Sequence, residues 1–292
     1  MQRLTSPRVV GYLLILPAVI YVLALIGFPL VLGVWYSLTN TTVATPGRFV
    51  GLQNFIDVTK DPTFFLAVRN TLIIGIVATA AKITLSVALA FLMLGAFPGR
   101  GILRTLFVLP WTIPIALSTI AYKWMFHSQY SVINWMLINV GILDQGIQWL
   151  GTPIPAMAAV IFVSTWRAVP FGAITVLAGL TAIPTEVIEA ARIDGAGWWA
   201  RFRHVIVPII APILFIALLF DLIFTLTELT VVFVLTGGGP VDQTQVLANY
   251  ALQVGVSGGQ LGQGAAIALY LLPVLLILTV LSLRHIGKRE GL

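Results

Sequence analysis

Long apolar stretches separated by short polar segments dominate the pattern of this sequence. A helix needs about 20 apolar residues to cross the hydrocarbon core of a bilayer, and six stretches reach that length. They are Tyr12–Ser37, Asn70–Leu94, Thr105–Phe126, Ile154–Leu180, Ile209–Leu235 and Gly262–Leu283. The pattern therefore predicts an all-α, polytopic membrane protein with six transmembrane helices. Prolines inside several of these stretches predict kinks, which membrane helices tolerate.

Composition supports a surface that mostly faces lipid. Hydrophobic residues make up 59% of the 292 residues and charged residues only 9%, whereas a soluble domain has about a quarter of its residues charged. The chain has no cysteine, which excludes disulfides and thiolate metal sites. Its three histidines are far apart in sequence and show no metal-ligand spacing. We therefore expect no metal site.

Basic residues are distributed unevenly between the polar segments, and this sets the expected orientation. With the N-terminus in the cytoplasm, ten Lys and Arg residues fall in cytoplasmic segments and four in external ones. Cytoplasmic loops carry the excess of positive charge in membrane proteins. We therefore expect both termini in the cytoplasm, and the net charge of +6 implies no nucleic-acid partner. The ten are Arg3, Arg8, Arg100, Arg104, Arg192, Arg201, Arg203, Arg284, Lys288 and Arg289, and the four are Arg48, Lys60, Arg69 and Lys123.

The polar segment between the fourth and fifth spans, residues 181–208, predicts a small structured element. Pro184 suits the first turn of a helix, and Glu186 and Glu189 stabilise that N-terminal end. Gly195 can take the left-handed conformation that ends a helix. A basic, aromatic segment then leads back toward the membrane. These features alone fit either an ordinary capped helix in a solvated loop or a docking element.

The same loop resembles the Glu-Ala-Ala signature loop of permease subunits of binding-protein-dependent ABC importers. Glu-Ala-Ala is followed, after three residues, by glycine and later by a hydrophobic-x-hydrophobic-Pro ending. The matching residues are Glu189, Ala190, Ala191, Gly195 and Pro208, while Val205 and Val207 stand where Ile and Leu are usual.

Other segments are similar to the carbohydrate importers of the maltose and glycerol-3-phosphate type, and this chain looks like their first permease subunit. They are Gly51–Phe55, Asn70–Leu72, Gly99–Gly101 with Arg104, Leu109–Trp111 and Thr236–Pro240. The resemblance implies the type I permease architecture in the cytoplasmic membrane. On this interpretation residues 1–292 form one permease domain, with a peripheral first span at 12–37, a core at about 66–284 and a cytoplasmic coupling loop at 181–208.

By this resemblance the loop is a coupling helix that sits in a cleft of an ATPase subunit. We expect the coupling residues to be Glu186, Glu189, Ala190, Ala191, Asp194 and Gly195. The implied partners are a second, homologous permease subunit, two ATPase subunits that bind ATP and Mg²⁺, and an extracytoplasmic solute-binding protein. This chain itself is expected to bind no cofactor and to be no enzyme, consistent with its lack of a Gly-x-x-x-x-Gly-Lys-Ser/Thr phosphate loop.

Besides Lys123, which is near the outer end of the third span and counts with the external residues, four ionisable residues fall within the predicted spans: Lys82, Arg167, Asp221 and Glu228. Each charge costs about 2.5–3.5 kcal/mol at the bilayer centre, so such residues face protein or water. They either form two interior ion pairs that hold helices together, Lys82 or Arg167 with Asp221 or Glu228, or contact a polar solute. For Lys82 and Asp221 we favour a role in ion pairs. By resemblance to the maltose system, the substrate-pathway candidates are Ser164, Arg167, Phe171, Thr227, Glu228 and Val231.

Two other function classes compete with an importer subunit. The Gly255–Gly258 segment has the Gly-x-Ser-Gly form of an intramembrane serine protease, but no histidine lies in a span to activate the serine, which excludes that catalysis. A secondary transporter or channel that works alone remains the alternative, since such proteins also place charges within the membrane.

Overall fold

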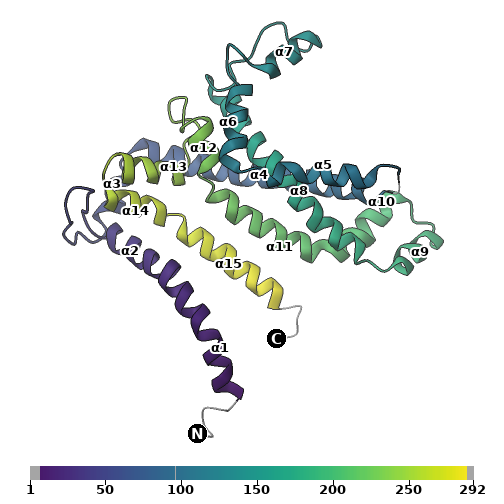
Figure 1. The fold of residues 1–292 in the computed structure, drawn as a ribbon, viewed down its shortest axis with the longest axis horizontal. Helices are drawn as coiled ribbons and strands as arrows, with labels where there is room; N and C mark the ends of the chain where they lie inside the picture. Colours follow the sequence, from purple (N-terminus) through teal and green to yellow (C-terminus); the bar gives the residue numbers. More distant parts are fainter. Residues whose placement is uncertain (1–6, 96, 288–292) are drawn as a thin grey trace. The chain divides into compact units, whose positions relative to one another are not determined.

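The computed structural model describes residues 7–95 and 97–287, and within them the chain is built from helices (Figure 1). The expected all-α class is confirmed, and the described part shows one isolated antiparallel bridge, between Thr39 and Phe49. Arg3, Lys288 and Arg289, which contribute to the predicted cytoplasmic charge, lie outside the described residues.

The helices follow one another along the chain with short connections, and some contain a π-helical segment, labelled η. In order they are α1 (Pro7–Val22), η1 (Leu23–Gly27), α2 (Phe28–Ser37), α3 (Gln53–Val58), α4 (Pro62–Leu94), α5 (Arg100–Thr112), α6 (Ile115–Met125), α7 (Val132–Asn139), α8 (Pro153–Thr181), α9 (Thr185–Ile193), α10 (Trp198–Arg201), η2 (Phe202–Ile206), α11 (Val207–Leu226), α12 (Thr230–Leu235), α13 (Leu247–Leu252), η3 (Gln253–Ser257), α14 (Leu261–Leu269) and α15 (Leu272–Gly287).

Among the described residues, five continuous helices are long and apolar enough to cross a membrane, and a bent pair of helices makes a possible sixth. The expectation of a polytopic membrane protein is confirmed, although the boundaries differ from those predicted. The five are Val10–Ser37, Pro62–Leu94, Pro153–Thr181, Trp198–Leu226 and Leu261–Arg284, and the pair is Arg100–Thr112 with Ile115–Met125.

The third predicted span is not one continuous helix. It consists of α5 and α6, which meet at an angle of 94°. Ile113 between them has extended backbone angles, φ −75° and ψ 132°, and Pro114 follows with ψ 132°. A proline clashes with the helical conformation of the residue before it, which explains why the helix ends at this point.

The fifth predicted span, Ile209–Leu235, also ends earlier than expected. The helix that contains α11 stops at Leu226, and the non-helical residues 227–229 separate it from α12. The Thr227 hydroxyl donates to the carbonyl of Ile223 at 3.0 Å, and the Glu228 carboxylate accepts the amide of Thr230 at 2.7 Å. Glu228 therefore satisfies an amide at the start of α12 that an interrupted helix leaves open, whereas the Ile223 carbonyl also accepts the backbone amide of Thr227.

The chain divides into two compact units, which are described separately. The first comprises Met1–Asp61 and Ala251–Leu271. Within it α14 packs against α2 and α3, and the Asn54 amide donates to the carbonyls of Ser37 and Thr39 at 2.8 Å each. Gly262 lies so close to the Thr39 carbonyl that any side chain there would collide with it. The Gly51–Phe55 segment therefore ties the end of α2 to the start of α14.

The second unit comprises Pro62–Tyr250 and Leu272–Leu292. Its main contact is the pair α4 and α8, and α11 packs against both (Figure 1). Small residues allow these close approaches: an added Cβ at Gly75 would lie 2.6 Å from Leu226 on α11, and Gly172 on α8 lies directly against Ser86 on α4. Close approach at small residues is how membrane helices associate without a hydrophobic driving force between them.

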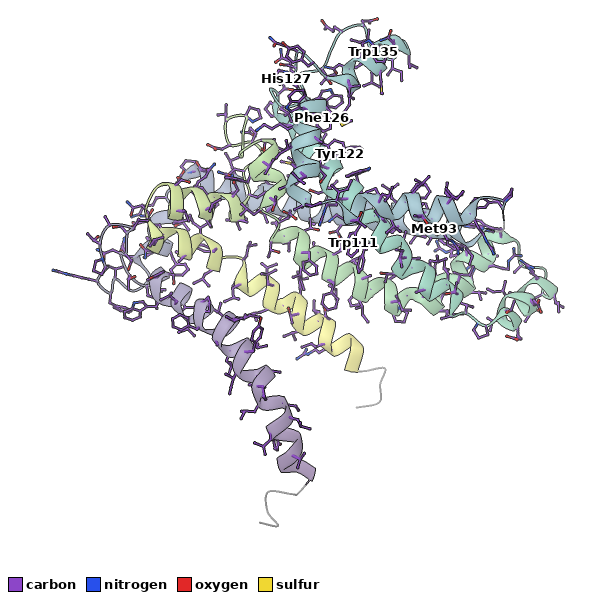
Figure 2. The ribbon with its side chains drawn as sticks, viewed as in Figure 1. Met93, Trp111, Tyr122, Phe126, His127 and Trp135 are labelled. Atoms are coloured by element: carbon purple, nitrogen blue, oxygen red, sulfur yellow. The ribbon has the colours of Figure 1, made fainter. Side chains whose placement is uncertain are left out.

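Aromatic side chains form the core of this unit around α6. Tyr122 stacks on Phe126 with ring centroids 5.9 Å apart and meets Trp166 of α8 edge-on at 5.0 Å. Phe126 contacts Trp149 at 5.4 Å, and the chain continues past His127 to α7, which carries Trp135 (Figure 2). These contacts connect α6 to α8 and to the segment that precedes α8.

Candidate functional site

The loop between α8 and the helix that contains α11 holds the short helix α9. It begins at Thr185, so Pro184 directly precedes the helix rather than lying in its first turn. Glu186 lies in the first turn and Arg192 in the last. Each charge is of the sign that stabilises its end of the helix dipole. The local sequence therefore favours this helix at both of its ends.

Gly195 terminates α9 in the left-handed conformation, with φ +79°. The amide of Gly195 donates to the carbonyl of Arg192, and the amide of Ala196 donates to the carbonyl of Ala191, each at 3.0 Å. This pair of bonds is the Schellman arrangement, which satisfies the last carbonyls of a helix. A Cβ at Gly195 would meet nothing within 4 Å. Backbone conformation, and not crowding, therefore accounts for glycine at this position.

The predicted coupling residues lie together on α9 and its C-terminal turn. No residue of α9 is buried in this chain, and the side chain of Ile193 is 87% exposed. The helix therefore presents most of its surface outward from the fold. Of the predicted residues, Ala191 is half-buried and the exposed ones are Glu186, Glu189, Ala190, Asp194 and Gly195.

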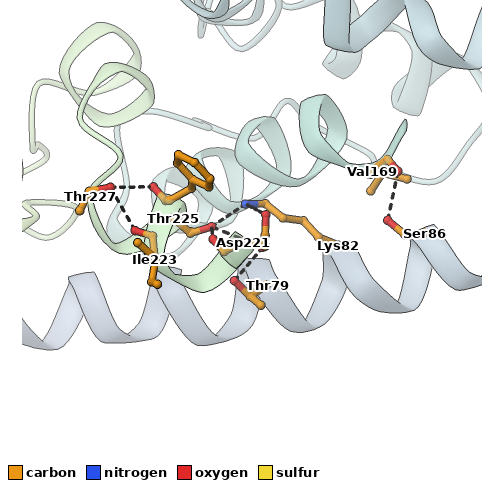
Figure 3. Close-up of polar contacts among 9 residues, drawn as sticks. Thr79, Lys82, Ser86, Val169, Asp221, Ile223, Thr225 and Thr227 are labelled. Atoms are coloured by element: carbon orange, nitrogen blue, oxygen red, sulfur yellow. Dashed lines mark hydrogen bonds and ion pairs between the residues drawn. The ribbon is translucent and has the colours of Figure 1, made fainter. Parts of the chain in front are cut away.

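Lys82 and Asp221 form an ion pair between α4 and α11 (Figure 3). The Lys82 Nζ lies 3.2 Å from Asp221 Oδ1 and donates to Thr225 Oγ1 at 2.6 Å. Thr79 Oγ1 donates to Asp221 Oδ2 at 2.9 Å. Lys82 is buried, so removing either partner would leave an uncompensated charge in the protein interior. This is the helix-joining arrangement that we favoured for these two residues.

Arg167 and Glu228 form no such pair with each other within the described residues. The Nε atom of Arg167 is buried and has no hydrogen-bond partner among the residues that the structure describes. The Glu228 carboxylate accepts the amide of Thr230 at the start of α12. Buried polar groups are almost always paired, so the unpartnered Arg167 nitrogen points to a water or a ligand.

Ser164 and Glu228 share a small cavity of about 10 Å³. A cavity of this size has room for roughly one water molecule, so in this conformation it is too small for a sugar. Its lining comprises Thr71, Ile74, Val160, Ser164, Thr225, Leu226, Glu228, Val232 and Val246.

The other pathway candidates occupy different surroundings. Val231 is 1% exposed and packs in the hydrophobic core, whereas Thr227 is exposed at the break after α11. Phe171 is 55% exposed and stacks on Trp111, the ring centroids lying 5.3 Å apart. The structure therefore brings Ser164 and Glu228 together but does not gather all six candidates around one cavity.

Asn70 and Thr71 have a role that the sequence did not reveal. The fully buried Asn70 donates to the carbonyls of Gln243 and Gln245 at 3.0 Å each and to that of Asp242 at 3.4 Å. Thr71 Oγ1 accepts the amide of Leu247 at 2.9 Å. These residues fix the loop 236–247 to the first part of α4. The Asn70–Leu72 segment had stood out as similar to carbohydrate importers, but without an assigned function.

Neither a metal centre nor a protease site is evident in the described residues. No group of three or more His, Cys, Asp or Glu residues in the described ranges is arranged to hold a metal. Gly255, from the Gly-x-Ser-Gly segment, packs against Gly264, where a Cβ would lie 3.1 Å from the Gly264 Cα. Close backbone packing therefore accounts for the first glycine of that segment.

Known proteins with similar sequences include a family that matches most of this chain. Residues 82–289 match the family described as binding-protein-dependent transport system inner membrane component. The chain is 33% identical to the trehalose/maltose transport system permease protein MalF of Thermococcus litoralis, over 94% of this chain and 92% of that protein. It is 32% identical to the sulfoquinovosyl glycerol transport system permease protein SmoG of Agrobacterium fabrum, over 97% and 92%. It is 29% identical to the sn-glycerol-3-phosphate transport system permease protein UgpA of Yersinia pseudotuberculosis, over 95% and 94%.

Solved structures show the same fold. A chain of a bacterial ABC transporter involved in the import of the acidic polysaccharide alginate matches with a TM-score of 0.82, at 21% identity, over 96% of this chain and 95% of that one. The alginate transporter in complex with a periplasmic protein bound to an alginate pentasaccharide matches with a TM-score of 0.80, at 22% identity, over 96% and 94%.

Proposed function

Because this chain belongs to the family of binding-protein-dependent transport system inner membrane components, we propose that it forms half of the membrane pathway of an ATP-driven sugar importer. The single observation that carries this proposal is the family match over residues 82–289, which includes the whole Glu-Ala-Ala loop. The chain is a permease subunit and not itself an enzyme.

In the proposed orientation both termini and α9 lie in the cytoplasm. The support is the excess of basic residues on that side, ten against four. Independent support comes from the Glu-Ala-Ala loop, because an ATPase that uses cellular ATP must meet it in the cytoplasm. The loops 38–69, 127–153 and 236–261 then face outward, where a solute-binding protein would dock.

In the proposed mechanism α9 sits in a cleft of an ATPase subunit and passes the closure of the ATPase dimer to the membrane helices. Glu189 and Gly195 are the principal coupling residues. The exposure of α9 supports this role, since the helix has few partners within its own chain. The Schellman turn at Gly195 supports it too, because it gives α9 a defined direction relative to the chain that returns to the membrane.

The proposed assembly contains this subunit, a second, homologous permease subunit, two ATPase subunits and an extracytoplasmic binding protein. ATP and Mg²⁺ are bound by the ATPase subunits and not by this chain. As the ATPases close, the permease pair changes from inward-facing to outward-facing and accepts the solute. It releases the solute inside after hydrolysis.

The proposed solute contacts are Thr227 and Glu228, at the break after α11, and Arg167 on α8. Interrupted helices at membrane depth expose backbone groups that can bind a polar substrate. The buried Nε of Arg167, which has no hydrogen-bond partner among the described residues, supports a ligand at Arg167, because guanidinium and carboxylate groups bind hydroxyls well. Ser164 and the exposed Phe171 remain secondary candidates, since aromatic faces complement the apolar side of a sugar ring.

Uptake into reconstituted vesicles tests this proposal. The permease pair, the ATPases and the binding protein are assembled in vesicles, and uptake of radiolabelled maltose, trehalose and glycerol 3-phosphate is measured with and without ATP and Mg²⁺ on the ATPase side. We expect uptake of at least one of these solutes to require ATP, the ATPases and the binding protein. Uptake at full rate by this chain alone would contradict the proposal and favour a stand-alone carrier.

A further inference from the structure

Three aromatic rings meet where the loop of α9 returns to the membrane helices, and Phe91, Trp198 and Phe202 are named here the aromatic cluster. Trp198 and Phe202 stack with their ring centroids 5.5 Å apart and their planes inclined by 3°. Phe91 on α4 meets Trp198 edge-on at 6.3 Å and Phe202 at 5.6 Å. Edge-to-face and stacked pairs at these separations are attractive. The cluster therefore joins α4 to the start of the helix that contains α11.

The cluster continues into the packed interior of the second unit. Phe91 packs against a buried cluster that consists of Ala90 of α4, Val176 and Leu180 of α8 and Ile210 of α11. Three long helices therefore meet at the same place. A displacement of Phe91 is transmitted to a close-packed region that deforms little.

Arg201 connects this cluster to the end of α9. Its Nη1 donates to the carbonyl of Ala196 at 2.6 Å, while the amide of Ala196 donates to the carbonyl of Ala191 within α9. Ala196 lies between two glycines, Gly195 and Gly197, which alone would make this segment a flexible hinge. The Arg201 bond instead fixes the turn between α9 and α10.

A second connection joins α4 and α11 deeper in the membrane. Lys82 of α4 pairs with Asp221 of α11, and Lys82 lies nine residues before Phe91. At 1.5 Å per residue the two connections are about 14 Å apart along α4. Two connections at different depths prevent α4 from sliding or tilting independently of α11.

We infer that Arg201 and the aromatic cluster are positioning residues that transmit the movement of α9 to α4 as well as to α11. This inference rests on the proposed function. The helix from Trp198 to Leu226 is continuous, so α11 follows α9 directly, whereas α4 is a separate element and moves only through side-chain contacts. Without the cluster, Lys82 still joins α4 to α11, about 14 Å away along α4, but ATP hydrolysis moves α11 without carrying along the end of α4 that bears Phe91.

Trp198 and Trp199 provide a matched pair of variants. They are 58% and 61% exposed, and Trp199 also contacts Phe202, at 5.4 Å, and Trp198, at 6.1 Å. Only Trp198 has a ring contact with Phe91 of α4. A role in anchoring the loop at the membrane surface would affect both variants alike, whereas a role in transmission affects Trp198 alone.

The test measures ATP hydrolysed per solute transported in the reconstituted complex of Trp198→Ala and Trp199→Ala, with co-purification of the ATPases as the check on assembly. We expect Trp198→Ala to raise this ratio at least about fivefold, the lower end of typical coupling effects, and Trp199→Ala to leave it unchanged. Phe91→Leu, which keeps apolar volume in the interior, should behave like Trp198→Ala. Equal ratios in Trp198→Ala, Phe91→Leu and the unmodified complex would overturn the inference, as would an equal rise in both tryptophan variants.

A labelled cysteine gives a readout that a purely structural role would not change. Because the chain has no cysteine, Leu94→Cys at the end of α4, 43% exposed, can carry a single environment-sensitive fluorophore. We expect ATP to change its signal in the otherwise unmodified complex and not in the complex that also carries Trp198→Ala. A signal that responds to ATP equally in both would refute the transmission to α4. Failure of the unmodified complex to transport with ATP would instead refute the proposed function.

Discussion

Gly195 adopts a φ of +79°, a conformation that costs an L side chain about 1–2 kcal/mol. A Cβ there would meet nothing within 4 Å, so a substitution tests the conformation without a clash. Gly195→Val should shift the end of α9 and lower ATP-driven uptake about fivefold or more, since 1 kcal/mol or more changes a conformational ratio by about that factor. The measurement is the initial uptake rate in reconstituted vesicles, together with ATP hydrolysis.

Gly197→Val is the matched control for that variant. Gly197 has φ −63° and ψ 170° and also has open space at its Cβ, so valine fits without strain. We expect near-normal uptake. Equal losses in the two valine variants would show that the left-handed turn is not what matters.

The Lys82–Asp221 pair predicts a pattern of stabilities. Breaking a buried ion pair by removing one partner costs about 3–5 kcal/mol, whereas removing both charges is often nearly neutral. We expect Lys82→Met to lower the thermal unfolding midpoint of the purified protein and Lys82→Met with Asp221→Asn to recover most of that loss. A single variant as stable as the unmodified protein would contradict the structural role of the pair.

Glu228 offers the sharpest test of the solute contacts. Glu228→Gln keeps an oxygen that can accept the Thr230 amide but removes the negative charge. A charged hydrogen bond contributes about 1.5–3 kcal/mol, so we expect the KM for uptake to rise about tenfold or more with normal assembly. An unchanged KM would show that Glu228 only accepts the Thr230 amide at the start of α12 and does not contact the solute.

At the scale of helices, the sequence predicted a helix boundary where residues within one turn determine it, and missed boundaries of other kinds. The end of α9 was predictable because Gly195 and the charges of α9 act within a single turn. The break before Pro114 was foreseen only as a kink, although the helices meet there at 94°. The end of α11 at Leu226 was missed because apolar residues continue through Leu235, while polar side chains at 227 and 228 interrupt the helix.

The loop 236–247 is held to α4 by one side-chain amide, that of Asn70. The Asn70 side chain holds three of its carbonyls, and hydrogen bonds contribute about 0.5–1.5 kcal/mol each. Because the amide has only two N–H groups to share among these carbonyls, Asn70→Ala should destabilise the protein by about 1–3 kcal/mol and increase proteolytic cleavage within 236–247. Asn139→Ala is the control, since Asn139 is exposed and its amide bonds only within its own helix, α7, to Trp135. Similar cleavage rates for the two variants would contradict this anchoring role.

At the scale of the whole molecule, the sequence was most informative where two independent patterns agreed. The charge count predicted which side of the membrane holds the loop 181–208, and the Glu-Ala-Ala resemblance required the same side. Contacts between residues that are far apart in the sequence could not be predicted from it. From the sequence, either Asp221 or Glu228 could pair with Lys82. Only the packing of α4 on α11 shows that the partner is Asp221. The substrate-pathway candidates remain a prediction, because they depend on a second subunit.

The first span also needs surroundings outside this chain. In the helix Val10–Ser37, the most apolar stretch has no buried residue, so its side chains must face lipid or another subunit. The same is true of the exposed surface of α9, which here is predicted to face an ATPase. This chain is therefore one component of a complex in which the subunits cover each other's exposed surfaces.

Labelling of Ile193→Cys tests the central claim most directly, because Ile193 is 87% exposed on α9 and the chain has no other cysteine. A membrane-impermeant maleimide is applied to inside-out and right-side-out vesicles, with and without the ATPase subunits. We predict labelling in inside-out vesicles only, and protection when the ATPases are bound. Labelling in right-side-out vesicles, or unchanged labelling in the presence of the ATPases, would contradict the claim that α9 receives the work of ATP hydrolysis in the cytoplasm.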